Sequence, residues 1–134
     1  GIVALEDIPE GTLVWESVHT ARFPSPTTYR RFLASLPDDL ACDVMLWAYV
    51  EDYPDETEGS TSGATPRPTI SVDLDAGSFM NTVSINDVKN LNPETYQTNR
   101  LVRAGEELIV DYSDFEKEGA WNAAGFGTKY KLHQ

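Results

Sequence analysis

Residues 104–112 read Ala-Gly-Glu-Glu-Leu-Ile-Val-Asp-Tyr, and they are the most informative part of the chain. Ala104-Gly105 favours a turn, because glycine adopts backbone conformations that other residues avoid. Leu108-Ile109-Val110 then predicts a short buried strand, since a brief apolar run bounded by turn residues is typical of one. Tyr112 follows two residues after the predicted end of that strand.

Further β-strands are predicted on both sides of this stretch. Residues 98–102 form a candidate strand, and in residues 69–74 apolar and polar side chains alternate as in a half-buried strand. Near the start, residues 2–4 and 13–15 are short β-prone runs, and the Pro and Gly of residues 7–11 favour a loop between them.

The middle of the chain predicts helices followed by a loop. Ser25 and Pro26 are a favourable cap and first residue for a helix, and apolar residues of 29–36 recur at helical spacing. A second helix is predicted to begin near Asp38 or Asp39, and its end is left open because residues 48–50 could equally be extended. Residues 51–68 are rich in Asp, Glu, Ser, Thr, Gly and Pro and predict a long loop.

The whole pattern predicts one small domain. Its 134 residues suit a single modest core, and we expect neither side of the loop to hold enough apolar residues for a domain of its own. Short strands at both ends with a helical insert between them predict a mainly β, mainly antiparallel fold.

The formal net charge of −12 bears on possible partners. An acidic surface repels phosphate backbones, so we expect no direct nucleic-acid binding. Such a surface attracts basic proteins, although acidity that serves only solubility is the simpler interpretation of charge alone. No apolar run is long enough for a bilayer, so we expect no membrane partner. Oligomeric state is left open.

Cysteine content bears on metal binding and on location. The single Cys42 excludes an intrachain disulfide and a cysteine-built zinc site, and we expect no metal. No positively charged leader precedes a hydrophobic stretch. We therefore expect an intracellular protein, nuclear or cytoplasmic.

Three separated segments resemble motifs of one family, the SET domains. Residues 1–4 with Asp7-Ile8-Pro9-Glu10-Gly11 are similar to the start of these domains, a glycine-rich strand followed by "D-I-x-x-G". Residues 75–81 resemble the segment that leads into the family's "N-H-S" motif. Residues 104–112 closely match "G-E-E-L-x-x-D-Y". The three segments stand in the family's order and together extend over nearly the whole chain.

This resemblance implies a particular fold. SET domains have a β-clip fold of several small sheets, with a knot-like crossing in which the C-terminal segment passes through a loop. Residues 1–134 would then form a single SET domain. Residues 16–68 would be its variable helical and loop insert, and residues 113–134 its C-terminal tail.

The resemblance also implies an activity, the transfer of a methyl group from S-adenosylmethionine to a lysine of a basic protein or peptide. Histones are common substrates in this family, and other proteins also occur. Tyr112 would be the catalytic residue that orients the lysine amine. The residues expected to bind the cofactor are Gly1, Ile2, Val3, Asn81, Thr82, Tyr112, Trp121 and Phe126.

Each of these residues also has a purely structural interpretation. Tyr112 could pack at a strand end and Asn81 could satisfy a turn, while Trp121 and Phe126 could belong to an ordinary core. For Asp111 and Glu107 we prefer a structural role, because carboxylates often hold turns through hydrogen bonds. Glu106 is expected to be solvated.

The sequence departs from the family's pattern at two places. Thr82 stands where the family has the His after Asn81, and Asn86-Asp87 lies where a "P-N" usually closes the motif. Threonine cannot reproduce the two-sided hydrogen bonding of an imidazole. A catalytically weak or inactive SET-like module that binds a protein partner is therefore the alternative function.

Overall fold

A computed structural model describes residues 1–53, 66–84, 87–116 and 119–125. The chain divides into two compact units, each with its own hydrophobic core. The first unit comprises Gly1–Thr20 and Asp73–Phe115, and the second comprises Ala21–Val72 and the described residues from Glu116 onward.

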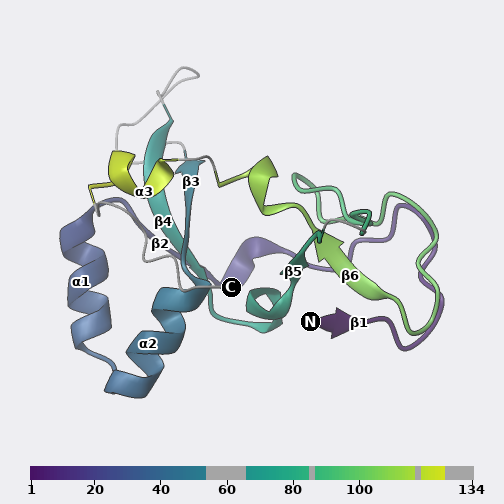
Figure 1. The fold of residues 1–134 in the computed structure, drawn as a ribbon, viewed down its shortest axis with the longest axis horizontal. Helices are drawn as coiled ribbons and strands as arrows, with labels where there is room; N and C mark the ends of the chain where they lie inside the picture. The colour runs from purple at the N-terminus through teal and green to yellow at the C-terminus, as the bar shows by residue number, and fades with distance from the viewer. Residues whose placement is uncertain (54–65, 85–86, 117–118, 126–134) are drawn as a thin grey trace. The chain divides into compact units, whose positions relative to one another are not determined.

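A three-stranded sheet organises the first unit. It consists of β1 (Ile2–Val3), β6 (Glu107–Val110) and β5 (Asn81–Thr82). β1 is antiparallel to β6, with Ile2 opposite Leu108, and β5 is parallel to β6, with Asn81 opposite Ile109. The sheet therefore joins the beginning, the middle and the late part of the sequence (Figure 1).

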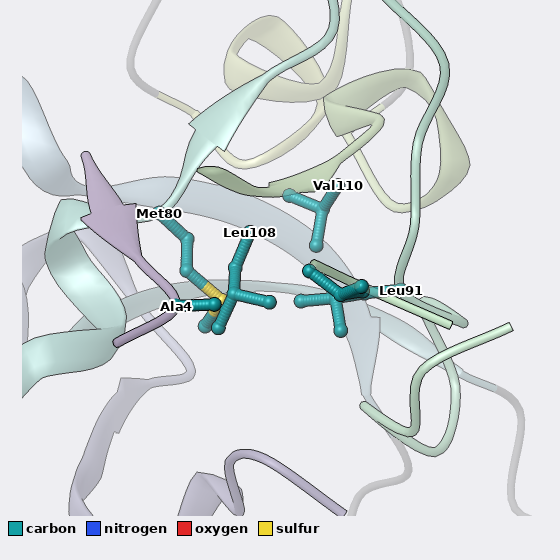
Figure 2. Packing of buried hydrophobic residues seen from close by; sticks show 6 residues of the cluster. Ala4, Met80, Leu91, Leu108 and Val110 are labelled. Atoms are coloured by element: carbon teal, nitrogen blue, oxygen red, sulfur yellow. The ribbon is translucent and has the colours of Figure 1, made fainter. Parts of the chain in front are cut away.

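Alternate residues of β6 enter the core of this unit. Leu108 and Val110 are buried, as expected for the predicted strand, whereas Ile109 between them is partly exposed. Figure 2 shows the side chains of Ala4, Met80 and Leu108 close together, with Leu91 beside Leu108. The buried cluster comprises Ala4, Met80, Leu91, Val102, Leu108 and Val110.

Asn90 supports β6 through its side chain. It is only 1 % exposed, its Nδ2 donates to the Glu107 carbonyl at 2.8 Å, and its Oδ1 accepts from the Ile109 amide at 2.9 Å. The Asn90 backbone amide also donates to the Ile109 carbonyl at 3.1 Å. An amide side chain carries both a donor and an acceptor, so it can stand in for the backbone of a neighbouring strand.

Two predicted strands of this unit form only isolated pairings. Residues 98–102 are not a continuous strand, because Thr98 pairs with Leu91 while Val102 pairs with Ile8. Residues 13–15 likewise contribute only Leu13, opposite Gln97. The residues of 98–102 have partners on two different segments, so no ladder develops along that run.

The predicted turn before β6 is present and is tied to the start of the chain. Gly105 has φ of +86°, which favours glycine. The Asp7 carboxylate accepts from the Ala104 amide at 2.9 Å and from the Arg103 guanidinium at 3.0 Å. These two bonds hold the pKa of Asp7 below its usual range. They join the "D-I-x-x-G" segment to the turn of the late motif.

The second unit contains a sheet with the order β2 (Thr20–Phe23), β4 (Arg67–Asp73) and β3 (Tyr49–Tyr53). The helices α1 (Pro26–Ala34) and α2 (Asp38–Trp47) lie beside it in Figure 1. The buried residues of this core are Tyr29, Val44, Ala48, Val50, Ile70 and Val72. Ser25 caps α1 as predicted, since its Oγ accepts from the Thr28 amide at 3.3 Å.

The loop predicted over residues 51–68 is too long at both ends. β3 continues to Tyr53 and β4 begins at Arg67, with Tyr53 opposite Arg67. Polar side chains on these strands have cross-strand partners: Ser71 Oγ donates to Glu51 Oε1 at 2.6 Å, and the Arg22 guanidinium lies 4.3 Å from the centre of the Tyr53 ring. Ser71 is fully buried, so this hydrogen bond satisfies its hydroxyl and allows a polar residue inside the paired strands.

The described residues thus form small sheets with a few short helices, which is compatible with a small mainly β fold. In this part of the chain, no helix combines the length and the apolar composition that crossing a bilayer requires.

Candidate functional site

Several of the predicted site residues meet in the sheet β1-β6-β5. Gly1 immediately precedes β1, Asn81 and Thr82 form β5, and Tyr112 begins the short 3-10 helix η3 (Tyr112–Asp114) after β6. The sheet therefore brings together residues from all three motif segments.

Tyr112 contacts the middle segment at two points. Its hydroxyl donates to the Met80 carbonyl at 2.6 Å, and its amide donates to Thr82 Oγ1 at 3.1 Å. The ring centre lies 5.6 Å from that of Phe115, and the residue is 39 % exposed. The Tyr112 side chain is thus held at its tip and at its base but still reaches solvent.

Thr82, which stands where the motif that this segment resembles has a histidine, contacts both β6 and Tyr112. Its hydroxyl accepts from the Tyr112 amide, and its backbone pairs with Val110 across the two parallel strands. Thr82 therefore links β5 to the end of β6. Its hydroxyl is directed to the protein backbone in this structure, so a direct bond to a cofactor stays a prediction.

Asn81 is paired with a carboxylate. Its Nδ2 donates to Glu107 Oε1 at 2.7 Å. Gly1 lies against the same pair, because a Cβ atom added to it would stand 1.6 Å from Glu107 Oε1 and 2.9 Å from Asn81 Nδ2. Only a residue without a side chain fits there unless the Glu107 side chain moves. Glu107 accepts a hydrogen bond from the Asn81 side chain, whereas we expected it to stabilise a turn.

Asp111 has the turn-holding role expected from the sequence. Its Oδ1 accepts from the Ser113 hydroxyl at 2.7 Å and from the Ser113 amide at 3.0 Å, which caps η3. These hydrogen bonds lower the pKa of Asp111. Lys89 Nζ donates to Asp114 at 2.8 Å and holds the same helix from another segment.

The other two residues of β1 have different surroundings. Ile2 is partly buried and packs against the first core, while Val3 is 50 % exposed. Both pair with β6 through their backbone, opposite Leu108 and Glu107. They thereby fix the position of Gly1 beside Asn81.

Glu106, by contrast, is not simply solvated. It accepts from the Arg103 amide at 2.5 Å and from the Arg100 guanidinium at 3.1 Å, and these bonds lower its pKa. It stabilises the turn before β6.

Of the two aromatic residues predicted from the tail, the structure describes only Trp121. Trp121 belongs to the second unit, in α3 (Ala120–Ala123), where its ring packs against that core and its Nε1 donates to Glu116 at 2.6 Å. Phe126 lies outside the described residues. A role for either residue over a cofactor stays a prediction.

The cluster offers hydrogen-bonding chemistry. An amide with donors and an acceptor, a neighbouring carboxylate and a phenol can bind a ligand that carries an ammonium and a carboxylate. Among residues 1–53, 66–84, 87–116 and 119–125, no three histidine, cysteine, aspartate or glutamate side chains are grouped to hold a metal ion.

Three contributions to this site were missed in the sequence: the Met80 carbonyl, the Glu107 carboxylate and the Asn90 amide. Glu107 was expected in a structural role, but its bond to Asn81 carried no sequence signal, because it depends on the register of two distant strands. For the other two there was no signal either, because backbone carbonyls carry no sequence signature and asparagine is common in loops.

No protein-family model matches this sequence, and no curated protein matches it.

Proposed function

We propose that this protein transfers a methyl group from S-adenosylmethionine to a lysine side chain of a basic protein, and that its fold is of the SET type with the knot-like C-terminal crossing. The observation that carries the proposal is the convergence of Gly1, Asn81 and Tyr112 at one small sheet, where Gly1 precedes β1, Asn81 lies in β5 and Tyr112 follows β6. These residues come from three segments that resemble the SET motifs, and they are far apart in the sequence.

The environment of Tyr112 suits a residue that orients an amine. A phenol has one proton, and that of Tyr112 is donated to the Met80 carbonyl. In a further hydrogen bond the phenol oxygen can act only as acceptor, which is the role needed to hold an N–H group of a neutral lysine. S-adenosylmethionine supplies an electrophilic methyl group on a sulfonium. The protein's task is to align the amine with that methyl and to exclude water.

The cluster around Asn81 fits the amino-acid end of this cofactor. The Asn81 amide provides a donor and an acceptor within one side chain, and Glu107 places a carboxylate beside it. The tight space at Gly1 supports the same assignment, since the family's glycine-rich strand is expected to approach the cofactor through its backbone.

Charge supports the choice of substrate. The chain carries a formal net charge of −12, which favours encounter with a lysine-rich peptide. Histone tails are one such class of peptide.

Binding and turnover test the proposal together. Titration calorimetry with S-adenosylhomocysteine should give saturable heat, and mass spectrometry of a lysine-rich peptide library with isotope-labelled S-adenosylmethionine should detect labelled methyl groups. We expect Tyr112→Phe to lower the methylation rate about 100-fold, because the amine loses its acceptor. The lost bond to Met80 should cost only about 1 kcal/mol of unfolding free energy.

Tyr53→Phe is the matched control, because it removes the same hydroxyl in the second unit and should retain the parent rate. A Tyr112→Phe protein that methylates at the parent rate would exclude a catalytic role for Tyr112.

One observation favours the alternative, a non-catalytic module that binds a protein partner. Thr82, at the position of the family's histidine, directs its hydroxyl to the Tyr112 amide. Absence of heat with S-adenosylhomocysteine at millimolar concentration would support this alternative and contradict methyl transfer.

A further inference from the structure

The pairing of Glu107 with Asn81 follows from the register of the parallel strands. Asn81 lies opposite Ile109. Residues 107 and 109 face the same side of the sheet, so Glu107 is the diagonal neighbour of Asn81 on that side. Its Oε1 accepts from Asn81 Nδ2 at 2.7 Å, the length of a charge-assisted hydrogen bond.

This bond determines which end of the amide faces outward. An ionised carboxylate can only accept hydrogen bonds, so it receives the Nδ2 group of Asn81 and repels the Oδ1 atom. The opposite orientation would bring two oxygen atoms together without a proton between them. Oδ1 is therefore the atom that Asn81 presents on the side away from Glu107.

Gly1 leaves the space that this arrangement needs. A Cβ atom at that position would overlap Glu107 Oε1, at 1.6 Å, and crowd Asn81 Nδ2, at 2.9 Å. Real Cβ atoms do not approach other heavy atoms so closely, so a side chain there would displace the carboxylate from the amide.

We infer that Glu107 is a positioning residue that fixes the Asn81 amide with its oxygen toward the ligand, so that the site selects a cofactor with a free α-ammonium group. This inference rests on the proposed function and names the group that the site recognises. The Asn81 oxygen accepts from the ammonium, and the adjacent negative charge of Glu107 favours a cation.

The first test needs no ligand. In the NMR spectrum of the free protein, the two Nδ2 protons of Asn81 should differ strongly in chemical shift, because one is bonded to a carboxylate. Glu107→Ala should bring the two shifts together, whereas Glu107→Gln keeps an acceptor and should preserve part of the difference. Unchanged Asn81 resonances in Glu107→Ala would overturn the inference.

The second test compares two ligands, S-adenosylhomocysteine and its analogue without the α-amino group. By calorimetry we expect the parent protein to bind the amino compound about tenfold more tightly. Glu107→Ala should reduce this preference to about twofold, and Glu107→Gln should retain about threefold. Glu106→Gln removes the same charge from the adjacent residue, which bonds to Arg100 and Arg103 instead, and should keep the full preference.

The outcomes separate this inference from the proposed function. A parent protein that binds neither compound contradicts methyl transfer itself. A parent that binds both equally, or a Glu107→Ala protein that keeps the tenfold preference or loses affinity for both compounds alike, overturns only the assignment of Glu107.

Discussion

Replacing Asn90 by alanine should destabilise the first unit strongly. The side chain is 1 % exposed and bonds to the Glu107 carbonyl and to the Ile109 amide. Alanine leaves both backbone groups of β6 without these partners, and each such buried group costs about 1–3 kcal/mol. We expect a loss of about 2–4 kcal/mol in the free energy of unfolding.

Urea unfolding measures this loss. With a slope of about 2 kcal/mol per molar urea, the midpoint should fall by about 1–2 M. The Ile109 amide should also lose protection in hydrogen exchange, because its acceptor is removed. Asn90→Asp nearly preserves the side-chain volume but cannot donate to the Glu107 carbonyl. It should therefore also lower the free energy of unfolding. Because the packing is nearly unchanged, this loss can be attributed to hydrogen bonding.

Asn92→Ala is the control for this experiment. Asn92 is exposed and its Oδ1 accepts only from the nearby Glu94 and Thr95 amides, so we expect a loss of no more than about 1 kcal/mol. If Asn90→Ala unfolds within about 0.5 kcal/mol of the parent, or no earlier than Asn92→Ala, then the side chain of Asn90 does not support β6 as described.

Two further changes test other parts of the first unit. Gly77→Ala should cost about 1–3 kcal/mol in urea unfolding, because its Cβ would lie 2.6 Å from the Trp15 ring; parent-like stability would mean that the ring moves freely. Asp7→Asn should be less stable than the parent at neutral pH, because the folded-state pKa of Asp7 is lowered by the Ala104 amide and the Arg103 guanidinium. That stabilisation is complete above the unfolded-state pKa of about 3.9 and is lost as the pH falls through the lower folded-state value, so the two unfolding curves should converge in acid; a constant difference would contradict this role.

Local signals in the sequence predicted several elements correctly. The Ser25 cap, α2 and the strand around Leu108 all depend on neighbouring residues, which a sequence pattern contains. The strand predicted over residues 98–102 was wrong, because pairing depends on what lies opposite, and Thr98 and Val102 have partners on different segments.

The candidate site was predicted in part, and only through resemblance. Tyr112 and Asn81 lie near each other as expected, since the Tyr112 hydroxyl bonds to Met80, the residue before Asn81. The partner of Asn81 could not be deduced, because it depends on the register of a parallel pair between distant segments. The role of Glu107 therefore became visible only in three dimensions.

The bond between Asp7 and Ala104 joins residues that are 97 positions apart in the chain. At a synthesis rate of about 5–20 residues per second, the ribosome needs roughly 5–20 s to produce the second partner after the first. During that interval β1 has no partner strand, and its apolar side chains remain exposed. Among the described strands, β1 therefore has the longest interval between its own synthesis and that of its partner, and chaperones can bind it throughout that time.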